Sequence, residues 1–215
     1  MTAPVHPGEA AAGATLPLDP ASSPSPALAW AWLSALFARQ PSAVEIAAHR
    51  VEPIAALMTD LGRDAELAPA IAAMRAALAG EDEEVAVDLA RAHARLFLGL
   101  AGPETVAPYE SAHVGDGRLF QAPVGEMERL LAAHDLSVAR DAGEPADHLA
   151  IETALMAGLV EEDHPDRAGL AARLAGWVPA FADACAARDR TGFYAAAARL
   201  VATLAEREAR GRCPE

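Results

Sequence analysis

The segment Glu144-Pro-Ala-Asp-His-Leu-Ala-Ile-Glu152 combines a helix start with the beginning of a periodic apolar face. Proline suits the first turn of a helix, because the amide hydrogen that it lacks would have no partner there. Apolar residues continue at Leu155 and Leu159, at the spacing of one helical face. The segment therefore predicts a helix that opens at Pro145 and packs along one side.

The same periodicity extends over most of the chain. Alanine makes up about a quarter of the residues and aromatic residues only 5%, a composition that favours helices over strands. No alternating pattern long enough to predict a strand is present. Helices are expected over 27–40, 42–62 with a break at Pro53, 69–78, 81–98, 123–134, from 145 onward, from 165 or 167 onward, and over 191–210. The predicted fold class is all-α.

Two segments depart from the helical pattern. Residues 1–26 contain six prolines among glycine, alanine and serine, which predicts a disordered tail. Residues 99–122 are punctuated by glycine and proline and predict a loop of unusual length. Such loops in compact domains are often functional.

The charge balance excludes several classes of protein. The chain has a formal net charge of −14 and no lysine. A nucleic-acid-binding protein would present a basic face, and both the P-loop and Schiff-base catalysis need a lysine. No stretch of 18 apolar residues occurs without a charge, so no membrane span is expected, and the first residues do not resemble a secretory signal. We expect a cytoplasmic protein, whose acidity serves either a basic partner or solubility alone.

Asp147, His148 and Glu152 form the main polar cluster of the sequence. Asp147 falls in the first turn of the predicted helix, where free N–H groups favour a negative charge. His148 and Glu152 lie four residues apart on a face that they share with apolar residues. They are expected either to hydrogen-bond to each other at a helix junction or to border a binding surface.

The sequence shows no metal or catalytic motif. His148 has no second helix with a matching Glu-x-x-His pattern, and Glu161-Glu-Asp-His164 is typical of a charged helix end. Ser111 is not part of a G-x-S-x-G turn, and Cys185 has no activating residue near it in the sequence. We therefore predict no enzymatic activity, no cofactor and no metal ligand.

Two aromatic residues stand apart from the expected core. Trp32 lies off the helical face that begins with Trp30, so we expect it to line a groove. Tyr109 lies in the long loop and is a candidate for a surface role.

Several segments, taken in order, resemble one family. They include the Pro/Gly-rich loop with Pro108-Tyr-Glu-Ser111, the segment 144–152, and Trp177-Val-Pro-Ala-Phe181; Leu96-Phe-Leu-Gly99, Leu119-Phe-Gln121 and Phe193-Tyr194 also fit. Together they are similar to the TorD/DmsD family of cytoplasmic chaperones for molybdenum-containing redox enzymes. His113, where the family often has an aromatic residue, and the Pro/Ala-rich tail are departures from its pattern.

The resemblance implies an organisation and a function. It implies a helical subdomain over 27–134, a hinge over 135–146 and a smaller helical subdomain over 147–215. It also implies a chaperone that binds the twin-arginine leader and the apo form of a molybdopterin-containing oxidoreductase. Such a chaperone aids cofactor insertion and prevents premature export through the Tat translocon. A monomer or a dimer, domain-swapped or not, is compatible with this organisation.

The residues and the resemblance together predict one site. A twin-arginine leader is basic and then apolar, so its binder needs carboxylates beside an apolar surface. The residues predicted to contact the leader or its protein are Tyr109, Ser111, Glu144, Pro145, Asp147, His148, Glu152 and Trp32. A helical metal-binding enzyme and a regulatory scaffold module remain the alternatives.

Overall fold

The computed structural model describes residues 3–5, 25–99, 102–115, 121–139 and 143–211. Most of the predicted tail, part of the long loop and part of the predicted hinge lie outside these ranges, as do Leu119 and Phe120. Within the described residues, none of the helices is long and apolar enough to cross a lipid bilayer.

The all-α prediction is confirmed. Helices run through most of the described residues, and two short strands, β1 (Ala3–Val5) and β2 (Leu136–Val138), accompany them. The helices are α1 Pro26–Ala38, α2 Ala43–Ala48, α3 Ile54–Leu61, α4 Ala68–Ala77, α5 Asp82–Phe97, α6 Ala122–Ala133, α7 Leu149–Glu161, α8 Arg167–Arg188 and α9 Phe193–Ala209.

Local sequence explains several of these boundaries. Ser25 caps α1 by accepting the Ala27 N–H, and Pro26 occupies the first turn. Ser42 and Glu45 form a reciprocal capping box at α2. The helix expected over 42–62 is divided into α2 and α3, with Pro53 immediately before α3.

The prediction that a helix opens at Pro145 is wrong by four residues. The helix α7 begins at Leu149, and His148 is its N-cap, with extended backbone angles of φ −74° and ψ 135°. The reason is a tertiary contact. Residues 145–148 form a turn closed by His148 N–H and the Pro145 carbonyl, and the bridge to Tyr109 holds His148 in an extended conformation, which competes with helix formation.

The two strands also differ from the expectation. β1 and β2 pair in parallel, with Ala3 opposite Leu136 and Val5 opposite Val138. Residues 3–5 are therefore not part of a disordered tail. Strands of three residues are too short to give an alternating pattern that sequence can reveal.

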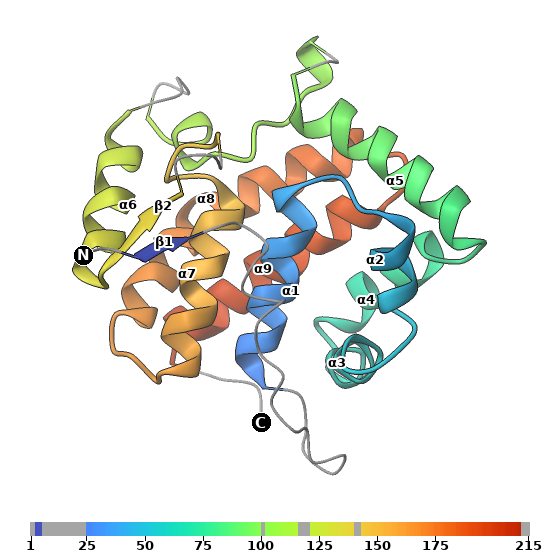
Figure 1. Cartoon of the computed structure of the whole chain (residues 1–215), viewed down its shortest axis with the longest axis horizontal. Coiled ribbons are helices and arrows are strands. Elements are labelled where there is room, and N and C mark those ends of the chain that lie inside the picture. Colours follow the sequence, from blue (N-terminus) through green and yellow to red (C-terminus); the bar gives the residue numbers. More distant parts are fainter. Residues whose placement is uncertain (1–2, 6–24, 100–101, 116–120, 140–142, 212–215) are drawn as a thin grey trace.

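A continuous hydrophobic core runs through the bundle. α1 lies along α7 and α8 lies along α9, while α9 also contacts α1 and α4 (Figure 1). Figure 1 also shows α6 and both strands at one end of the molecule and α2 to α4 at the other. The rings of Phe37, Phe97, Phe181 and Tyr194 meet at centroid distances of 5.2–6.4 Å. The core thus crosses the boundary predicted at 135–146, and the two-subdomain division stays a prediction.

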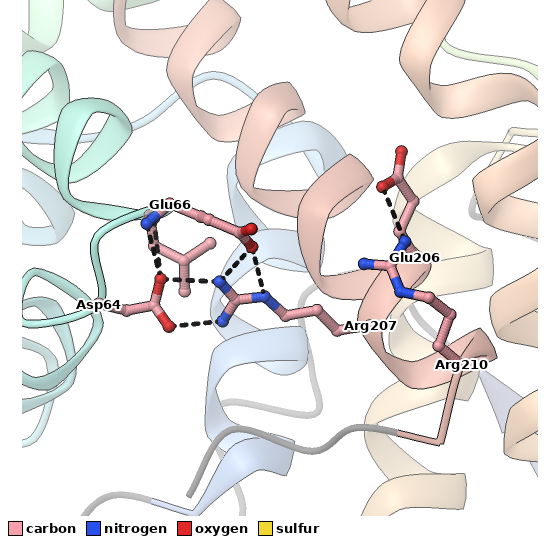
Figure 2. Close-up of polar contacts among 6 residues, drawn as sticks. Asp64, Glu66, Glu206, Arg207 and Arg210 are labelled. Carbon is pink, nitrogen blue, oxygen red and sulfur yellow. Dashed lines mark hydrogen bonds and ion pairs between the residues drawn. The ribbon is translucent and has the colours of Figure 1, made fainter.

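An arginine near the end of α9 joins that helix to the turn between α3 and α4. Arg207 donates to both carboxylate oxygens of Asp64, at 2.6 and 2.7 Å, and to Glu66 Oε2 at 2.6 Å (Figure 2). The hydrogen bonds from Arg207 lower the pKa of Asp64 from 3.8 to about 2. Asp64 is 143 residues from Arg207 in sequence, so this ion pair ties distant parts of the chain together.

Candidate functional site

The long loop and the residues before α7 pair as a short antiparallel bridge centred on Tyr109 and His148. Glu110 N–H donates to the Asp147 carbonyl at 3.0 Å, and Leu149 N–H donates to the Pro108 carbonyl at 2.9 Å. These backbone bonds satisfy polar groups that burial would otherwise leave unpaired. The bridge brings residues from two predicted site segments side by side.

Tyr109 forms the outer edge of this bridge. Its hydroxyl donates to Glu144 Oε2 at 2.6 Å, and its ring meets the His148 ring edge-on at a centroid distance of 5.1 Å. Burial, and then the neighbouring Glu144 carboxylate, raise the pKa of the Tyr109 hydroxyl. The hydroxyl therefore stays protonated and acts as a hydrogen-bond donor. Tyr109, Glu144 and Pro145 are all half-buried, so this edge remains accessible.

Asp147 lies beneath that edge and is completely buried. Its Oδ2 accepts the backbone N–H of Ser111 at 3.0 Å, which fixes the short 3₁₀ turn Glu110–Ala112. Ser111 is itself 1% exposed, so its hydroxyl does not reach the surface. Asp147 and Ser111 hold the loop in place from within.

One interpretation of the spacing predicted a side-chain hydrogen bond between His148 and Glu152, but the His148 side chain caps α7 instead, and the two residues share only the backbone bond from Glu152 N–H to the His148 carbonyl at 3.1 Å. His148 Nδ1 accepts the Ala150 N–H at 3.1 Å. Burial lowers the pKa of His148 to about 3, so the ring is neutral at physiological pH. A neutral ring is required here because a protonated Nδ1 cannot accept that bond.

Glu152 belongs instead to a buried arginine-centred cluster. Its Oε2 accepts the Trp177 indole N–H at 3.1 Å, and its Oε1 lies 3.8 Å from Arg173 Nε. Arg173, in α8, also pairs with Glu110 in the loop and with Glu126 in α6, the latter at 2.9 Å. The cluster therefore ties α6, α7, α8 and the loop to one guanidinium.

Carboxyl groups outnumber the positive charge in this cluster. Burial raises the pKa of Glu152 well above 4.5, and the negative charges of Glu110 and Asp147 raise it further, against the opposing effect of Arg173. Burial likewise raises the pKa of Glu110. Both raised pKa values favour the neutral form of the acid, so the cluster holds its carboxyl groups around a single guanidinium.

Most of the predicted residues are brought together, and Trp32 is not. Tyr109, Ser111, Glu144 and Asp147 meet at the bridge, together with Pro145 and His148, and Glu152 lies in the adjoining cluster. Trp32 is 4% exposed, and its indole N–H donates to His49 Nε2 at 3.1 Å. The prediction that Trp32 lines a groove is therefore wrong, because its side chain is buried and is bonded to His49 at the end of α2.

Sequence reasoning missed Arg173 and Glu126. No local motif marks either residue, because each is one charged residue on a helix and their shared contacts depend on how α6 and α8 pack. His113, which departs from the family pattern in sequence, stacks on Trp177 at a centroid distance of 5.5 Å.

The family model described as nitrate reductase delta subunit matches residues 61–183. The chain belongs to this family. The matched segment runs from the end of α3 into α8 and contains the bridge and the arginine-centred cluster. Membership confirms the resemblance on which the sequence predictions relied.

Several family relatives carry the name chaperone protein TorD. One from Photobacterium profundum is 31% identical over 195 residues, which cover 83% of this chain and 89% of the relative. One from Vibrio atlanticus is 32% identical over 186 residues, covering 79% and 86%. One from Vibrio parahaemolyticus is 30% identical over 186 residues, which cover 79% of this chain and 86% of the relative. These relatives support the predicted class, a chaperone rather than an enzyme.

Proposed function

We propose that this chaperone binds the twin-arginine leader and the apo form of a molybdopterin-containing oxidoreductase in the cytoplasm. By holding the leader it delays export through the Tat translocon until the cofactor has been inserted. Family membership and the TorD names of the relatives support this proposal. The structural observation that carries it is the excess of carboxyl groups where the loop meets the start of α7.

The accessible edge formed by Tyr109 and Glu144 offers a carboxylate that an arginine can bind. Glu144 is half-buried, and its carboxylate accepts a hydrogen bond from the neutral hydroxyl of Tyr109. A guanidinium binds a carboxylate through two parallel hydrogen bonds, which fixes its orientation. The leader arginine is assigned to Glu144, with the Tyr109 ring beside it. Asp147, Ser111 and His148 act as positioning residues, because they are buried and hold this edge in place.

The apolar part of the leader supplies most of the affinity. Burying four or five apolar side chains gives on the order of 6–15 kcal/mol. Ordering the peptide costs about 2–5 kcal/mol, and association costs more. Binding in the micromolar range follows, with charge setting register and rate more than affinity.

The test is titration of a synthetic leader peptide into wild-type protein and a Glu144→Gln variant. Losing a half-buried charged hydrogen bond costs about 1.4 kcal/mol, a tenfold loss of affinity. The control is Asp183→Asn, which removes the same charge from an exposed ion pair between Asp183 in α8 and Arg199 in α9. It should bind the peptide as the wild type does.

A second peptide, with both arginines replaced by lysine, completes a double-mutant cycle. Glu144→Gln should weaken binding of the arginine peptide more than that of the lysine peptide. Equal loss for both peptides, or equal loss in Asp183→Asn, would remove Glu144 from the leader site. If the protein binds no leader peptide but does bind a folded partner protein, the scaffold alternative is favoured.

A further inference from the structure

Three potential metal ligands from two separate turns converge at the end of α6. His134 follows the last residue of α6, while His164 and Asp166 lie in the turn between α7 and α8. One ligand atom from each of the three lies within 4.8 Å of the other two. The group is outside the bridge and the arginine-centred cluster.

Both imidazoles face the same carboxylate oxygen. Asp166 Oδ2 is 3.2 Å from His134 Nε2 and 3.8 Å from His164 Nδ1. The two rings meet edge-on at a centroid distance of 4.7 Å. His134 is the most enclosed, with 13% of its side chain exposed, and Asp166 opens to solvent. These separations approximate those between ligands around one tetrahedral ion with bonds of about 2.0–2.2 Å.

The backbone fixes both histidines through the helix ends. Asp135 and Asp163 are the non-glycine residues with positive φ in the described chain, at 57° and 51°. Each is adjacent in sequence to one of the two histidines. His164 N–H donates to the Leu159 carbonyl at 2.8 Å, the closing bond of a Schellman turn. Rigid turns on either side preorganise the three ligands.

Each imidazole directs one ring nitrogen toward Asp166 Oδ2, and each of these nitrogens can ligate a metal ion. The nearby cation Arg167 is engaged by Asp163 and by Glu208, the latter at 2.8 Å. Two neutral imidazoles and one carboxylate are the donor set that divalent transition metals favour, whereas Mg²⁺ and Ca²⁺ prefer all-oxygen sites.

We propose that His134, His164 and Asp166 bind one divalent transition-metal ion, for which Zn²⁺ is the best fit. Water completes the tetrahedral coordination, since the three residues offer three ligand atoms. His164 Nδ1 accepts the Asp166 N–H at 3.2 Å, a bond that coordination through this nitrogen replaces. The ion would fasten the end of α6 to the turn that joins α7 and α8. This proposal is independent of the leader-binding function.

The test uses full-length protein treated with a chelator and titrated calorimetrically with Zn²⁺. We expect one equivalent bound with a micromolar or tighter Kd. His134→Ala and His164→Ala should each weaken binding at least about 100-fold, since each removes one of only three protein ligands. Co²⁺ provides a second readout, because tetrahedral coordination gives visible absorption bands that the variants should lose.

The matched controls are Asp135→Asn and Asp163→Asn. Asparagine tolerates the left-handed conformation at both positions, and each change removes a carboxylate adjacent to the cluster but outside it. Both controls should bind Zn²⁺ as the wild type does. If His134→Ala does not fold, Asp166→Asn tests the same site at a more exposed position.

Three results would overturn the proposal. They are absence of stoichiometric Zn²⁺ binding, binding that persists in the His134→Ala/His164→Ala double variant, and equal losses in the controls and in the histidine variants. Zn²⁺ should also raise the wild-type thermal midpoint in a concentration-dependent way, and this effect should vanish in the double variant.

Discussion

The backbone N–H of Ser111 donates to Oδ2 of Asp147 at 3.0 Å, joining residues 36 positions apart. Both residues are buried, so this contact lies beneath the accessible edge formed by Tyr109 and Glu144. The sequence leaves two roles open for Asp147, contact with a leader arginine or support of the hinge, and its burial and its bond to Ser111 favour support. Under the proposed function, Glu144 presents the carboxylate to the leader.

Asp147→Ala is expected to destabilise the protein by about 1–3 kcal/mol, because the Ser111 N–H is left buried without a partner. Asp147→Asn keeps an acceptor oxygen and should lose less. Urea unfolding measures both free energies, and amide hydrogen exchange at Ser111 should accelerate in the alanine variant. An alanine variant as stable as the wild type would show that the contact does not hold the loop.

Glu152→Gln is expected to gain stability relative to the wild type as pH rises. Burial raises the pKa of Glu152 well above 4.5, so the folded protein binds more protons there than the unfolded chain does. Wild-type stability therefore falls with rising pH through this group, and glutamine removes that loss. Urea unfolding at pH 5.5 and pH 8 gives the difference between variant and wild type.

The exposed Glu206→Gln provides the control for this experiment and should show no such trend. If Glu152→Gln is destabilised equally at both pH values, the carboxylate is ionised throughout and its attraction to Arg173 dominates.

His93 is expected to make the protein sensitive to acid. It is 3% exposed between Phe97 and Tyr194, and burial lowers its pKa to about 4. The unfolded chain takes up a proton near pH 6.5 and the folded chain does not, so stability falls as pH decreases from about 6.5 to 4. His93→Phe should reduce the loss between pH 7 and pH 4.5 by about 2–3 kcal/mol. An unchanged loss would show that His93 already carries a proton in the folded state.

The Arg207 contact should contribute stability that disappears in acid. Asp64 has a folded pKa of about 2 against 3.8, so its contribution is complete above pH 4 and is lost as pH falls through 2. At neutral pH, Asp64→Asn should cost about 1–2 kcal/mol, since the pair is bidentate but partly exposed to solvent. Asp183→Asn breaks a more exposed pair and should cost less than about 0.5 kcal/mol. Equal effects of the two variants in urea unfolding would contradict a special role for Arg207.

Local patterns predicted the helices well. Ser42 with Glu45, Pro26, and the apolar spacing through Leu155 and Leu159 act within a few residues, so sequence alone reveals them. The sequence predicts that the Tyr109 loop and the His148 segment border one surface, and in the structure a bridge between Tyr109 and His148 brings them together.

Long-range pairing explains what sequence reasoning missed. The helix α7 starts at Leu149 and not at Pro145 as predicted, because Asp147 and Leu149 hydrogen-bond to the long loop through their backbones. Arg173 pairs with carboxyl groups from the long loop, α6 and α7, and no residue near it in the sequence indicates these contacts. Trp32 lies off the main apolar face of α1, yet it is buried and its indole N–H donates to His49 at the end of α2.

The pairing of α1 with α7 and of α9 with α4 has a consequence for biosynthesis. Residues 39–148 must be translated between α1 and the helix that covers it, and α9 leaves the ribosome last among these helices. At a translation rate of roughly 5–20 residues per second, α1 is made several seconds before α7 and longer before α9. Its buried tryptophans are exposed to solvent during that interval. The core therefore closes only after α9 has been made.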